Sequence, residues 1–482
     1  MSEDLDRMSR PQLVKVIKDM QAELDQISSD VSIKRGTSDI VLPTGMSYDE
    51  AIEWLYRKKE EDETVVDLQH QIQCHPLDGA YALLKAIQKR FGWANMVPTP
   101  GFFGPTPPSM ITMRVGPNED DTVMVPWGKM QIPKFDGTIY VDYQAVDSIP
   151  AFIIGASTKK KDQAKFYELA KLAQHFVETE SVYHRKALSM KLDWVREGRL
   201  FDPRIDGFKF INLSGVKEAQ LIFDKTTTDI LEATLFSFIE NVDRCRELHI
   251  PLKRGVLLEG PYGVGKTLTA YITAKKAIDN GFTFILVEDS RDLDKIITMA
   301  RRYQPCVLFC EDIDRILSGQ RDITVDSLLN TIDGLQSKGG EMILVLTSNN
   351  VENINQAMLR PGRLDAVIRL EAPDAEAVER LIRYYAGPLL ETSSNIKSAA
   401  AKLQGNIPAT IREVVERAKM ISMIKGRTGE KSITGDDLDI SAESMKRQLQ
   451  LLIPKPVVQD KVKLFGEVVG GHIAEAIHSY KE

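Results

Sequence analysis

The second half of the chain alternates almost unbroken apolar runs with polar or helix-forming segments. The runs cover residues 255–259, 282–287, 306–310 and 342–347. Strands buried on both faces of a parallel sheet read as continuous apolar runs, so the four runs predict an open parallel sheet. Residues 268–276, after the first run, are typical of a helix. This pattern predicts an α/β core.

The first half of the chain carries shorter segments with alternating hydrophobic and polar positions. They lie at residues 110–115, 122–131, 137–144 and 151–155 and predict the strands of a small mixed α+β domain. A long helical stretch over residues 162–195 is expected to close this region.

Helices are also predicted before these strands. Ser47 and Glu50 form a capping box for a helix over residues 48–59, and residues 78–91 carry apolar side chains on one side. Between residues 13 and 31, apolar positions recur with heptad spacing. That segment is either a self-associating coiled coil or an amphipathic helix lying on the protein's own surface.

A glycine-rich stretch of the form G-x-x-x-x-G-K-T separates the first apolar run from its helix. The predicted nucleotide-binding residues are Gly260, Pro261, Tyr262, Gly263, Val264, Gly265, Lys266, Thr267 and Leu268. Glycines let consecutive backbone N–H groups point at phosphate oxygens, and the helix N-terminus adds positive potential. Lys266 is expected to reach the β- and γ-phosphates, and the Thr267 hydroxyl to ligate Mg²⁺. A chance glycine-rich turn would not explain both flanking elements.

Polar residues follow two later strands. Glu311 and Asp312 come after the run 306–310, and Asn349 comes after the run 342–347. Ligands bind at the carboxyl edge of an open parallel sheet, so these side chains are expected near the glycine-rich loop. One acid would hold hydrated Mg²⁺ and its neighbour would polarise the water that attacks the γ-phosphate. Asn349 would hydrogen-bond the γ-phosphate or that water, the alternative being a turn asparagine.

Arg360 and Arg363 occupy a turn that contains Pro361 and Gly362. Two guanidinium groups on a rigid turn suit the stabilisation of charge on a transferring phosphoryl group. Because they lie far along the chain from the glycine-rich loop, we expect them to act on the nucleotide of a neighbouring subunit. The alternative is a surface turn with structural salt bridges.

Composition narrows the class of protein. The chain has 482 residues, 43% hydrophobic and 27% charged, as in soluble proteins of two or three domains. A net charge of −7 gives no global basic field for nucleic acid. Cys74, Cys245, Cys306 and Cys310 show neither disulfide nor zinc-ribbon spacing. With no apolar run of membrane-spanning length and no signal peptide, we expect a cytoplasmic protein without a membrane partner.

Two features outside the α/β core are open to a functional reading. His70, Cys74 and His75 are close enough in sequence to ligate a metal, but only one end of such a site is visible. We therefore favour the alternative that these residues lie on the surface and edge of a helix and bind no metal. The three lysines at residues 159–161 suit phosphate contact, but a short lysine run is usually a solvated face.

These elements, in this order and spacing, resemble the AAA+ ATPases, specifically the AAA clade proper, over residues 215–445. The resemblance implies a Walker A loop at residues 260–267 and a Walker B strand at residues 307–312. It also implies that Asn349 is a sensor-1 residue and that Arg360 and Arg363 are arginine fingers acting in trans.

The resemblance further implies a doubly wound parallel P-loop NTPase sheet with a C-terminal helical lid, preceded here by a mixed α+β N-terminal domain. The expected organisation is a helix at 1–35, a specificity domain at 36–200, a linker at 201–228, the nucleotide-binding core at 229–372, the lid at 373–445 and a tail at 446–482.

The sequence departs from the clade in three places. Glu311-Asp312 replaces the usual Asp-Glu, so by position Glu311 would serve the metal and the shorter Asp312 the water. Tyr262 replaces a proline. The interval 288–305 is short and lacks the aromatic-hydrophobic-glycine pore loop of threading enzymes, which counts against threading. The short interval and the Glu-Asp-Ile-Asp sequence at residues 311–314 are similar to the mitochondrial Rieske-protein translocase branch, whose membrane anchor is not seen in this sequence.

The leading hypothesis is a homo-oligomeric ring, a hexamer, that binds ATP and Mg²⁺ and hydrolyses ATP to remodel a protein or nucleic-acid substrate. One alternative is an ATP-switched assembly scaffold with little turnover, because Asp312 is short. The other is a nucleic-acid-remodelling ATPase.

Overall fold

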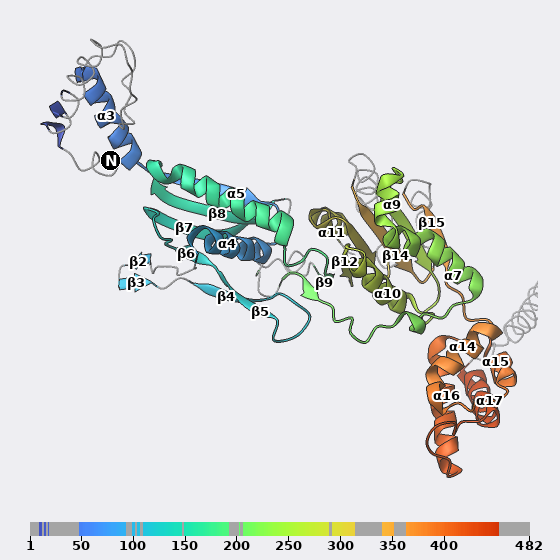
Figure 1. The fold of residues 1–482 in the computed structure, drawn as a ribbon. Coiled ribbons are helices and arrows are strands. Elements are labelled where there is room, and N and C mark those ends of the chain that lie inside the picture. Colours follow the sequence, from blue (N-terminus) through green and yellow to red (C-terminus); the bar gives the residue numbers. More distant parts are fainter. Residues whose placement is uncertain are drawn as a thin grey trace, which may run out of the picture. The chain divides into compact units, whose positions relative to one another are not determined.

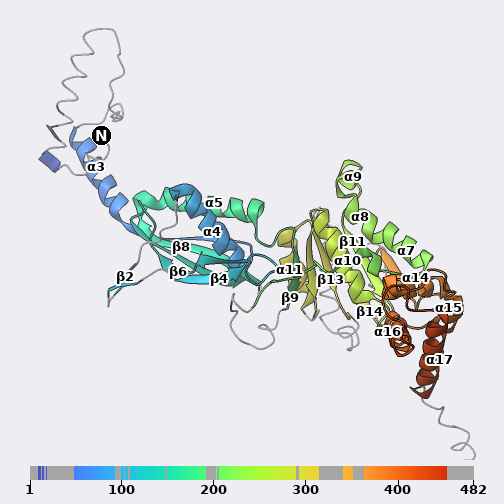
Figure 2. The same ribbon diagram turned by 60° about the horizontal axis from the view of Figure 1, so that its bottom comes forward.

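The structure is a computed structural model. It describes residues 48–92, 99–101, 104–106, 109–146, 149–191, 206–288, 292–313, 340–350 and 363–452, with positions 9–11, 14, 15, 18 and 202. The chain divides into two compact units (Figures 1 and 2). The N-terminal unit comprises Met1–Asn212 and Asp292–Gln304. The second unit comprises Leu213–Arg291 and Pro305–Glu482, and is called the nucleotide-binding unit after the binding residues predicted in it. The finer domain boundaries drawn from the sequence remain a prediction.

The N-terminal unit is built on an antiparallel sheet of four strands in the order β1-β8-β7-β6. The strands are β1 (Val65–Ile72), β6 (Gly128–Met130), β7 (Gly137–Val146) and β8 (Ile149–Lys159). Helices α4 (Pro76–Phe91) and α5 (Gln163–Glu180) pack side by side against it (Figure 1). A Cβ on Gly79 of α4 would lie 2.1 Å from the ring of Phe152, so the glycine allows α4 to approach β8 closely.

Further helices and strands of this unit come in the order predicted from the sequence. They are helix α3 (Tyr48–Glu63) and the antiparallel pairs β2 (Thr99–Gly101) with β3 (Gly104–Thr106) and β4 (Met110–Arg114) with β5 (Thr122–Pro126). The predicted strands and the helices over 48–59 and 78–91 are confirmed at the level of element type. Strand β1 was not predicted. The predicted heptad helix over residues 13–31 lies almost entirely outside the described residues.

The predicted helix over residues 162–195 is wrong in its length. Helix α5 ends at Glu180, and β9 (Ala187–Met190) then pairs antiparallel with β10 (Lys209–Phe210). The physical reason lies in α4. Asp78 accepts hydrogen bonds from the Ser181 hydroxyl at 2.7 Å and from the Val182 N–H at 2.9 Å, so this N–H is not used by a continuing helix.

The N-terminal unit also includes a segment from the middle of the chain. Helix α11 (Leu293–Ala300) and the 3₁₀ turn η4 (Arg301–Tyr303) belong to it, although the strands before and after them belong to the nucleotide-binding unit. The Tyr303 hydroxyl accepts a hydrogen bond from the His75 N–H at 3.0 Å, and Arg302 donates to Gln73 Oε1 at 2.7 Å. The interval 288–305, which lacks the pore-loop motif, therefore contains a helix and a turn that belong to the N-terminal unit.

The nucleotide-binding unit contains five parallel strands in the order β12-β13-β14-β11-β15. They are β11 (Arg254–Glu259), β12 (Thr283–Val287), β13 (Cys306–Cys310), β14 (Met342–Ser348) and β15 (Ala366–Arg369). Helix α10 (Lys266–Asp279) connects β11 to β12 and packs against β12 and β13. The predicted α/β fold with a parallel sheet is confirmed.

The segment before β11 is helical but divided into short pieces. They are α7 (Lys225–Leu231), a π-helical turn η3 (Glu232–Phe236), α8 (Ser237–Glu240) and α9 (Val242–Glu247). Leu231, Leu235, Phe236 and Ile239 are buried, so apolar side chains on both sides of the π turn and within it face inward.

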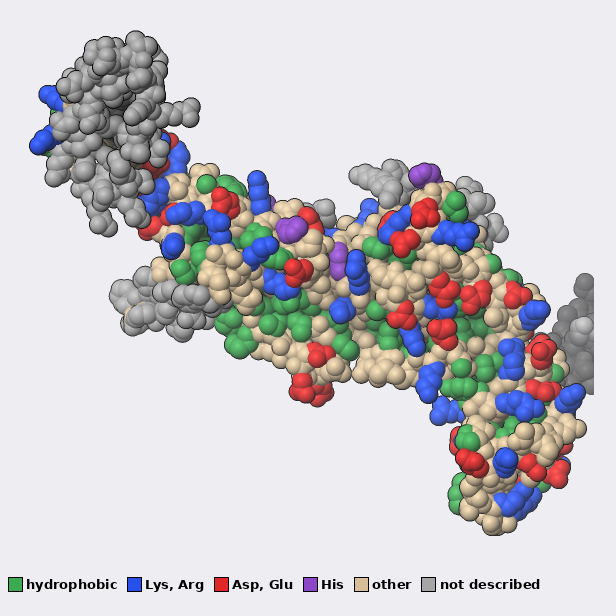
Figure 3. All heavy atoms as spheres, in the orientation of Figure 1, with side chains coloured by type: hydrophobic (Ala, Val, Ile, Leu, Met, Phe, Trp, Pro, Cys, Tyr) green, Lys and Arg blue, Asp and Glu red, His purple; other side chains and the backbone are tan. Residues whose placement is uncertain are grey.

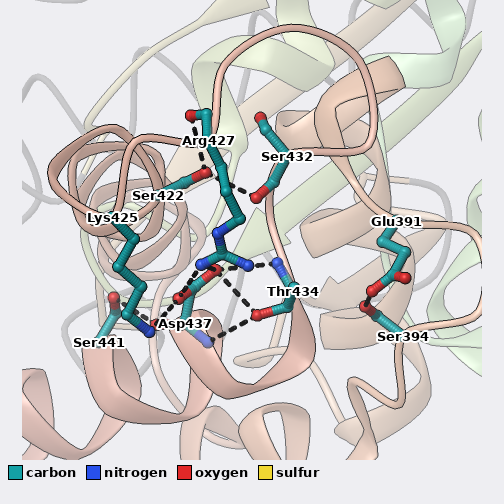
Figure 4. Close-up of polar contacts among 9 residues, drawn as sticks. All are labelled: Glu391, Ser394, Ser422, Lys425, Arg427, Ser432, Thr434, Asp437 and Ser441. Carbon is teal, nitrogen blue, oxygen red and sulfur yellow. Dashed lines mark hydrogen bonds and ion pairs between the residues drawn. The ribbon is translucent and has the colours of Figure 1, made fainter.

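The lid that follows β15 is a bundle of helices around one apolar core. It contains α14 (Ala375–Ala386), η6 (Gly387–Leu389), α15 (Lys397–Leu403), α16 (Pro408–Ile424) and α17 (Gly435–Leu452). At the start of α17 the buried Asp437 carboxylate gathers Lys425, Arg427 and Thr434 around it (Figure 4). This network connects the end of α16 to the start of α17.

Among the helices that the structure describes, none combines the length and the hydropathy needed to cross a membrane.

Candidate functional site: a phosphate-binding cavity

The glycine-rich loop lies between the end of β11 and the start of α10, as predicted. Gly263 has φ 82° and Gly265 has φ 116°, conformations that only glycine adopts without strain. The side chain of Val264 is buried at 2% exposure, which anchors the loop, while Tyr262 is 67% exposed. The loop thus presents backbone N–H groups at a helix N-terminus, the arrangement that binds phosphate.

Lys266 is held inside this loop. Its ammonium donates to the Gly260 carbonyl at 2.6 Å, to the Pro261 carbonyl at 3.0 Å and to Asn349 Oδ1 at 2.8 Å. It also lies 5.6 Å from the centre of the Tyr262 ring, within range of a cation–π contact. The same three hydrogen-bond directions can be taken by phosphate oxygens when a nucleotide binds.

Thr267 and Glu311 meet although they come from different elements. The Thr267 hydroxyl, in the first turn of α10, donates to Glu311 Oε1 at 2.7 Å, just beyond the end of β13. A hydroxyl and a carboxylate oxygen are ligands of the kind that Mg²⁺ takes, together with water and phosphate oxygens. The residues present therefore fit a hydrated Mg²⁺ at this position.

Asp312 and Asn349 form the far wall of the site. Asn349 Nδ2 donates to Asp312 Oδ1 at 3.1 Å, while Asn349 Oδ1 accepts from Lys266. The order β13-β14-β11 explains this meeting, because parallel strands bring their carboxyl ends to one edge of the sheet. Asn349 stands between the loop lysine and the acid.

These side chains border one cavity of about 280 Å³. Its lining residues are Tyr262, Gly263, Gly265, Lys266, Thr267, Leu268, Glu311, Asp312, Thr347 and Asn349. The cavity brings six of the nine predicted nucleotide-binding residues together with Glu311, Asp312 and Asn349. The other three, Gly260, Pro261 and Val264, do not line it.

The family scan matches residues 256–372 to the model described as ATPase family associated with various cellular activities (AAA). The chain therefore contains an AAA+ ATPase domain. The chain is 29% identical over 238 residues to the ATP-dependent zinc metalloprotease FtsH 2 of Methylacidiphilum infernorum, and this match covers 45% of the chain and 35% of that protein. It is 26% identical over 270 residues to the proteasome-activating nucleotidase of Methanosphaerula palustris, 52% of this chain and 64% of that protein.

The chain spans less than half the length of the first FtsH relatives, for example 38% of the FtsH of Thermus thermophilus.

Of the two predicted arginine fingers, the structure describes only Arg363. Arg360 lies outside the described residues. Arg363 is partly exposed and precedes β15, where its carbonyl faces Gly255 at the start of β11. The glycine-rich loop begins at the other end of β11. At a rise of about 3.3 Å per residue the two ends of β11 are about 16 Å apart. Arg363 and the phosphate site thus lie at opposite edges of the sheet within one subunit.

The sequence analysis missed residues that complete the site. Phe223, from the predicted linker, has its ring 3.5 Å from where a Cβ of Gly265 would lie, and Ile407, at the start of α16, comes within 2.9 Å of a Cβ on Gly263. Arg380 of the lid donates to the Phe223 carbonyl at 2.5 Å. Thr347 lines the cavity from β14. The sequence offered no periodic signal for any of them, since each acts by tertiary position.

Proposed function

We propose that this AAA+ ATPase hydrolyses ATP with Mg²⁺ at sites between identical subunits of a ring and uses the cycle to remodel a protein substrate. The observation that supports this most is the convergence of Lys266, Thr267, Glu311, Asp312 and Asn349 on one cavity. A phosphate-binding loop alone would support binding. Loop, acids and amide together provide a place for the attacking water as well.

In the proposed reaction the loop amides and Lys266 hold the triphosphate. Bound Mg²⁺, held by Thr267 and through water by Glu311, would neutralise charge on the β- and γ-phosphate oxygens. As Lys266 turns to phosphate it leaves Asn349 Oδ1, which then accepts a hydrogen bond from the attacking water. Asp312 polarises the same water as general base.

Arg363 is proposed to act on the site of the adjacent subunit. Its backbone lies beside Gly255, at the end of β11 away from its own phosphate loop, and this position supports action in trans. Arg360, three residues earlier, remains a prediction for the same role. A repeated head-to-tail contact of this kind closes into a ring, for which we propose six subunits.

A protein substrate is favoured over nucleic acid. The names of the relatives connect AAA domains of this kind with a metalloprotease and with the proteasome. The three lysines at residues 159–161 are engaged with acids: Lys159 with Glu63 and Asp136, Lys160 with Glu61, and Lys161 with Glu63. Figure 3 shows acidic and basic side chains interspersed over the visible face. Neither observation favours a phosphate backbone as ligand.

The test combines two variants that should each be inactive. Lys266→Ala removes the phosphate lysine and Arg363→Ala removes the finger, so each homogeneous protein should release almost no phosphate. A 1:1 mixture creates interfaces in which an intact loop meets an intact arginine. With random assembly of head-to-tail contacts, about a quarter of the interfaces are complete and activity should return to a similar fraction of wild type.

The outcomes separate the alternatives. Wild-type protein that binds ATP tightly and assembles but releases no phosphate would favour the scaffold. An active wild type whose mixed variants stay inactive would contradict the finger in trans.

A further inference from the structure

The backbone at Asp312 departs from its strand in a conformation that residues other than glycine seldom adopt. The Glu311 N–H still continues the ladder by donating to the Val287 carbonyl at 3.1 Å. One residue later, Asp312 has φ 50°, in the left-handed region. This conformation is disfavoured for a side chain with a Cβ, although aspartate tolerates it better than most residues. It persists only where the surroundings hold it.

Thr347 provides that hold from the neighbouring strand. Its side chain is buried at 1% exposure on β14. The Thr347 hydroxyl oxygen accepts the Asp312 N–H at 3.0 Å, and the Thr347 carbonyl accepts the Ile313 N–H at 2.9 Å. One residue thus receives two consecutive N–H groups, one through its side chain and one through its main chain. Without the hydroxyl, residue 347 would offer only its backbone carbonyl as an acceptor for these two N–H groups.

The turn at Asp312 decides where its carboxylate lies. Asp312 Oδ1 accepts a hydrogen bond from Asn349 Nδ2 at 3.1 Å, and both Asp312 and Thr347 line the phosphate-binding cavity. Thr347 therefore holds the backbone of the acid while Asn349 holds its side chain. Aspartate is one methylene shorter than glutamate, so the backbone conformation has a larger share in placing the carboxylate.

We propose that Thr347 is a positioning residue for ATP hydrolysis: its hydroxyl holds Asp312 in the left-handed conformation and so places the Asp312 carboxylate against the attacking water. The inference rests on the proposed function, in which Asp312 is the general base. It makes the hydroxyl of Thr347, rather than the volume of its side chain, the feature that hydrolysis requires.

Thr347→Val tests this directly, because valine has the shape of threonine without the hydroxyl. The turnover number for ATP should fall roughly tenfold to a hundredfold, as expected when a buried N–H loses its acceptor at a reacting group. The affinity for ATP should change by less than about threefold, because the loop amides and Lys266 are untouched. Thr347→Ser restores the hydroxyl and should recover most of the lost turnover.

A matched control separates the role of this hydroxyl from that of any buried threonine. Thr273 is 0% exposed inside α10, and its hydroxyl donates to the Thr269 carbonyl at 2.7 Å. Thr273→Val makes the same substitution at equal burial and should leave turnover within about twofold of wild type.

A double-mutant cycle provides the second measurement. In the Asp312→Asn background the general base is already lost, so adding Thr347→Val should lower the residual turnover no further. Equal turnover of Thr347→Val and wild type, or full additivity in the cycle, would overturn the inference. If Thr347→Val does not fold, Thr347→Ser and Thr347→Ala are compared instead, and only the serine variant should retain turnover. A wild type without ATPase activity would instead contradict the proposed function.

Discussion

At the scale of single residues, Asp78 of α4 is a buried acid whose pKa lies above its ordinary value. Its side chain is fully buried, and burial raises the pKa of the carboxyl to about 6, although hydrogen bonds from Ser181 and Val182 act in the opposite direction. A folded-state pKa above the unfolded value means that the folded protein binds the proton more tightly. The stabilisation is therefore complete below about pH 4 and is lost as the pH rises through 6.

Asp78→Asn should remove this dependence. The free energy of unfolding of the variant minus that of wild type should rise by about 3 kcal/mol between pH 4 and pH 7, because only wild type pays the cost of a buried charge. The asparagine carbonyl can still accept from Val182, and its amide can donate to Ser181. The measurement is chemical denaturation of both proteins across this pH range. A difference that stays constant with pH would contradict the assignment.

His75 acts with the opposite sign in the same region. Burial lowers the pKa of its imidazole to about 4, partly offset by the hydrogen bond to the Asp206 carbonyl. The stabilisation from neutral His75 is present above pH 6.5 and is lost as the pH falls towards 4. His75 and Asp78 therefore oppose each other across this window, which is why the comparison above uses the difference between two proteins that share His75.

At the scale of elements, the junction between α16 and α17 depends on Asp437. Burial acts to raise the pKa of Asp437, but hydrogen bonds from Lys425, Thr434 and Arg427 outweigh it and hold the pKa at about 2. The carboxylate accepts from the Thr434 N–H at 3.0 Å and from its hydroxyl at 2.9 Å (Figure 4). It thereby satisfies a backbone donor at the start of α17 and closes the loop from α16.

Asp437→Asn should destabilise the lid by about 2 kcal/mol, since it removes the charge that receives two cations and leaves their donors poorly paired. Hydrogen exchange of the amides in α16 and α17 measures this loss locally. Asp436 is the matched control, because it lies in the same first turn and is exposed. Asp436→Asn loses only its interaction with the helix dipole, about 0.5 kcal/mol. Equal effects of the two substitutions would show that the buried network is unimportant.

At the scale of the whole molecule, the N-terminal unit depends on a segment that lies between two strands of the nucleotide-binding unit. Tyr303 is 1% exposed and packs edge-on against Tyr183 and Phe208. Arg302 donates to the Pro150 carbonyl at 3.0 Å, and His184 is hydrogen-bonded to the Arg302 carbonyl at 3.2 Å. The fold of one unit thus uses residues whose sequence position belongs to the other.

Tyr303→Ala should therefore loosen the N-terminal unit, by about 3 kcal/mol or more for a large buried ring. Hydrogen exchange in the full chain should show the loss of protection in α4, β1 and β9. Phe309→Ala provides the contrast, because Phe309 is equally buried on β13, only six residues later. Its loss of protection should fall on β12, β13 and β14. Indistinguishable exchange patterns for the two variants would contradict the division.

What the sequence determined by itself was local in origin. Each apolar run is buried on both faces, and the residues of the glycine-rich loop lie within a few positions of one another. The strands and the phosphate-binding residues could therefore be predicted. The meeting of Glu311, Asp312 and Asn349 with Lys266 could also be predicted, because parallel strands end at one edge of a sheet.

Only the tertiary structure decided the features that depend on contacts between distant residues. The end of α5 depends on Asp78, about a hundred residues earlier. The assignment of residues 292–304 to the N-terminal unit depends on the aromatic packing of Tyr303. The left-handed turn at Asp312 depends on a hydroxyl of the adjacent strand. The periodicity of hydrophobic positions along the chain indicates which side chains are buried. The hydrogen-bond partner of a side chain depends on how the strands and helices are brought together.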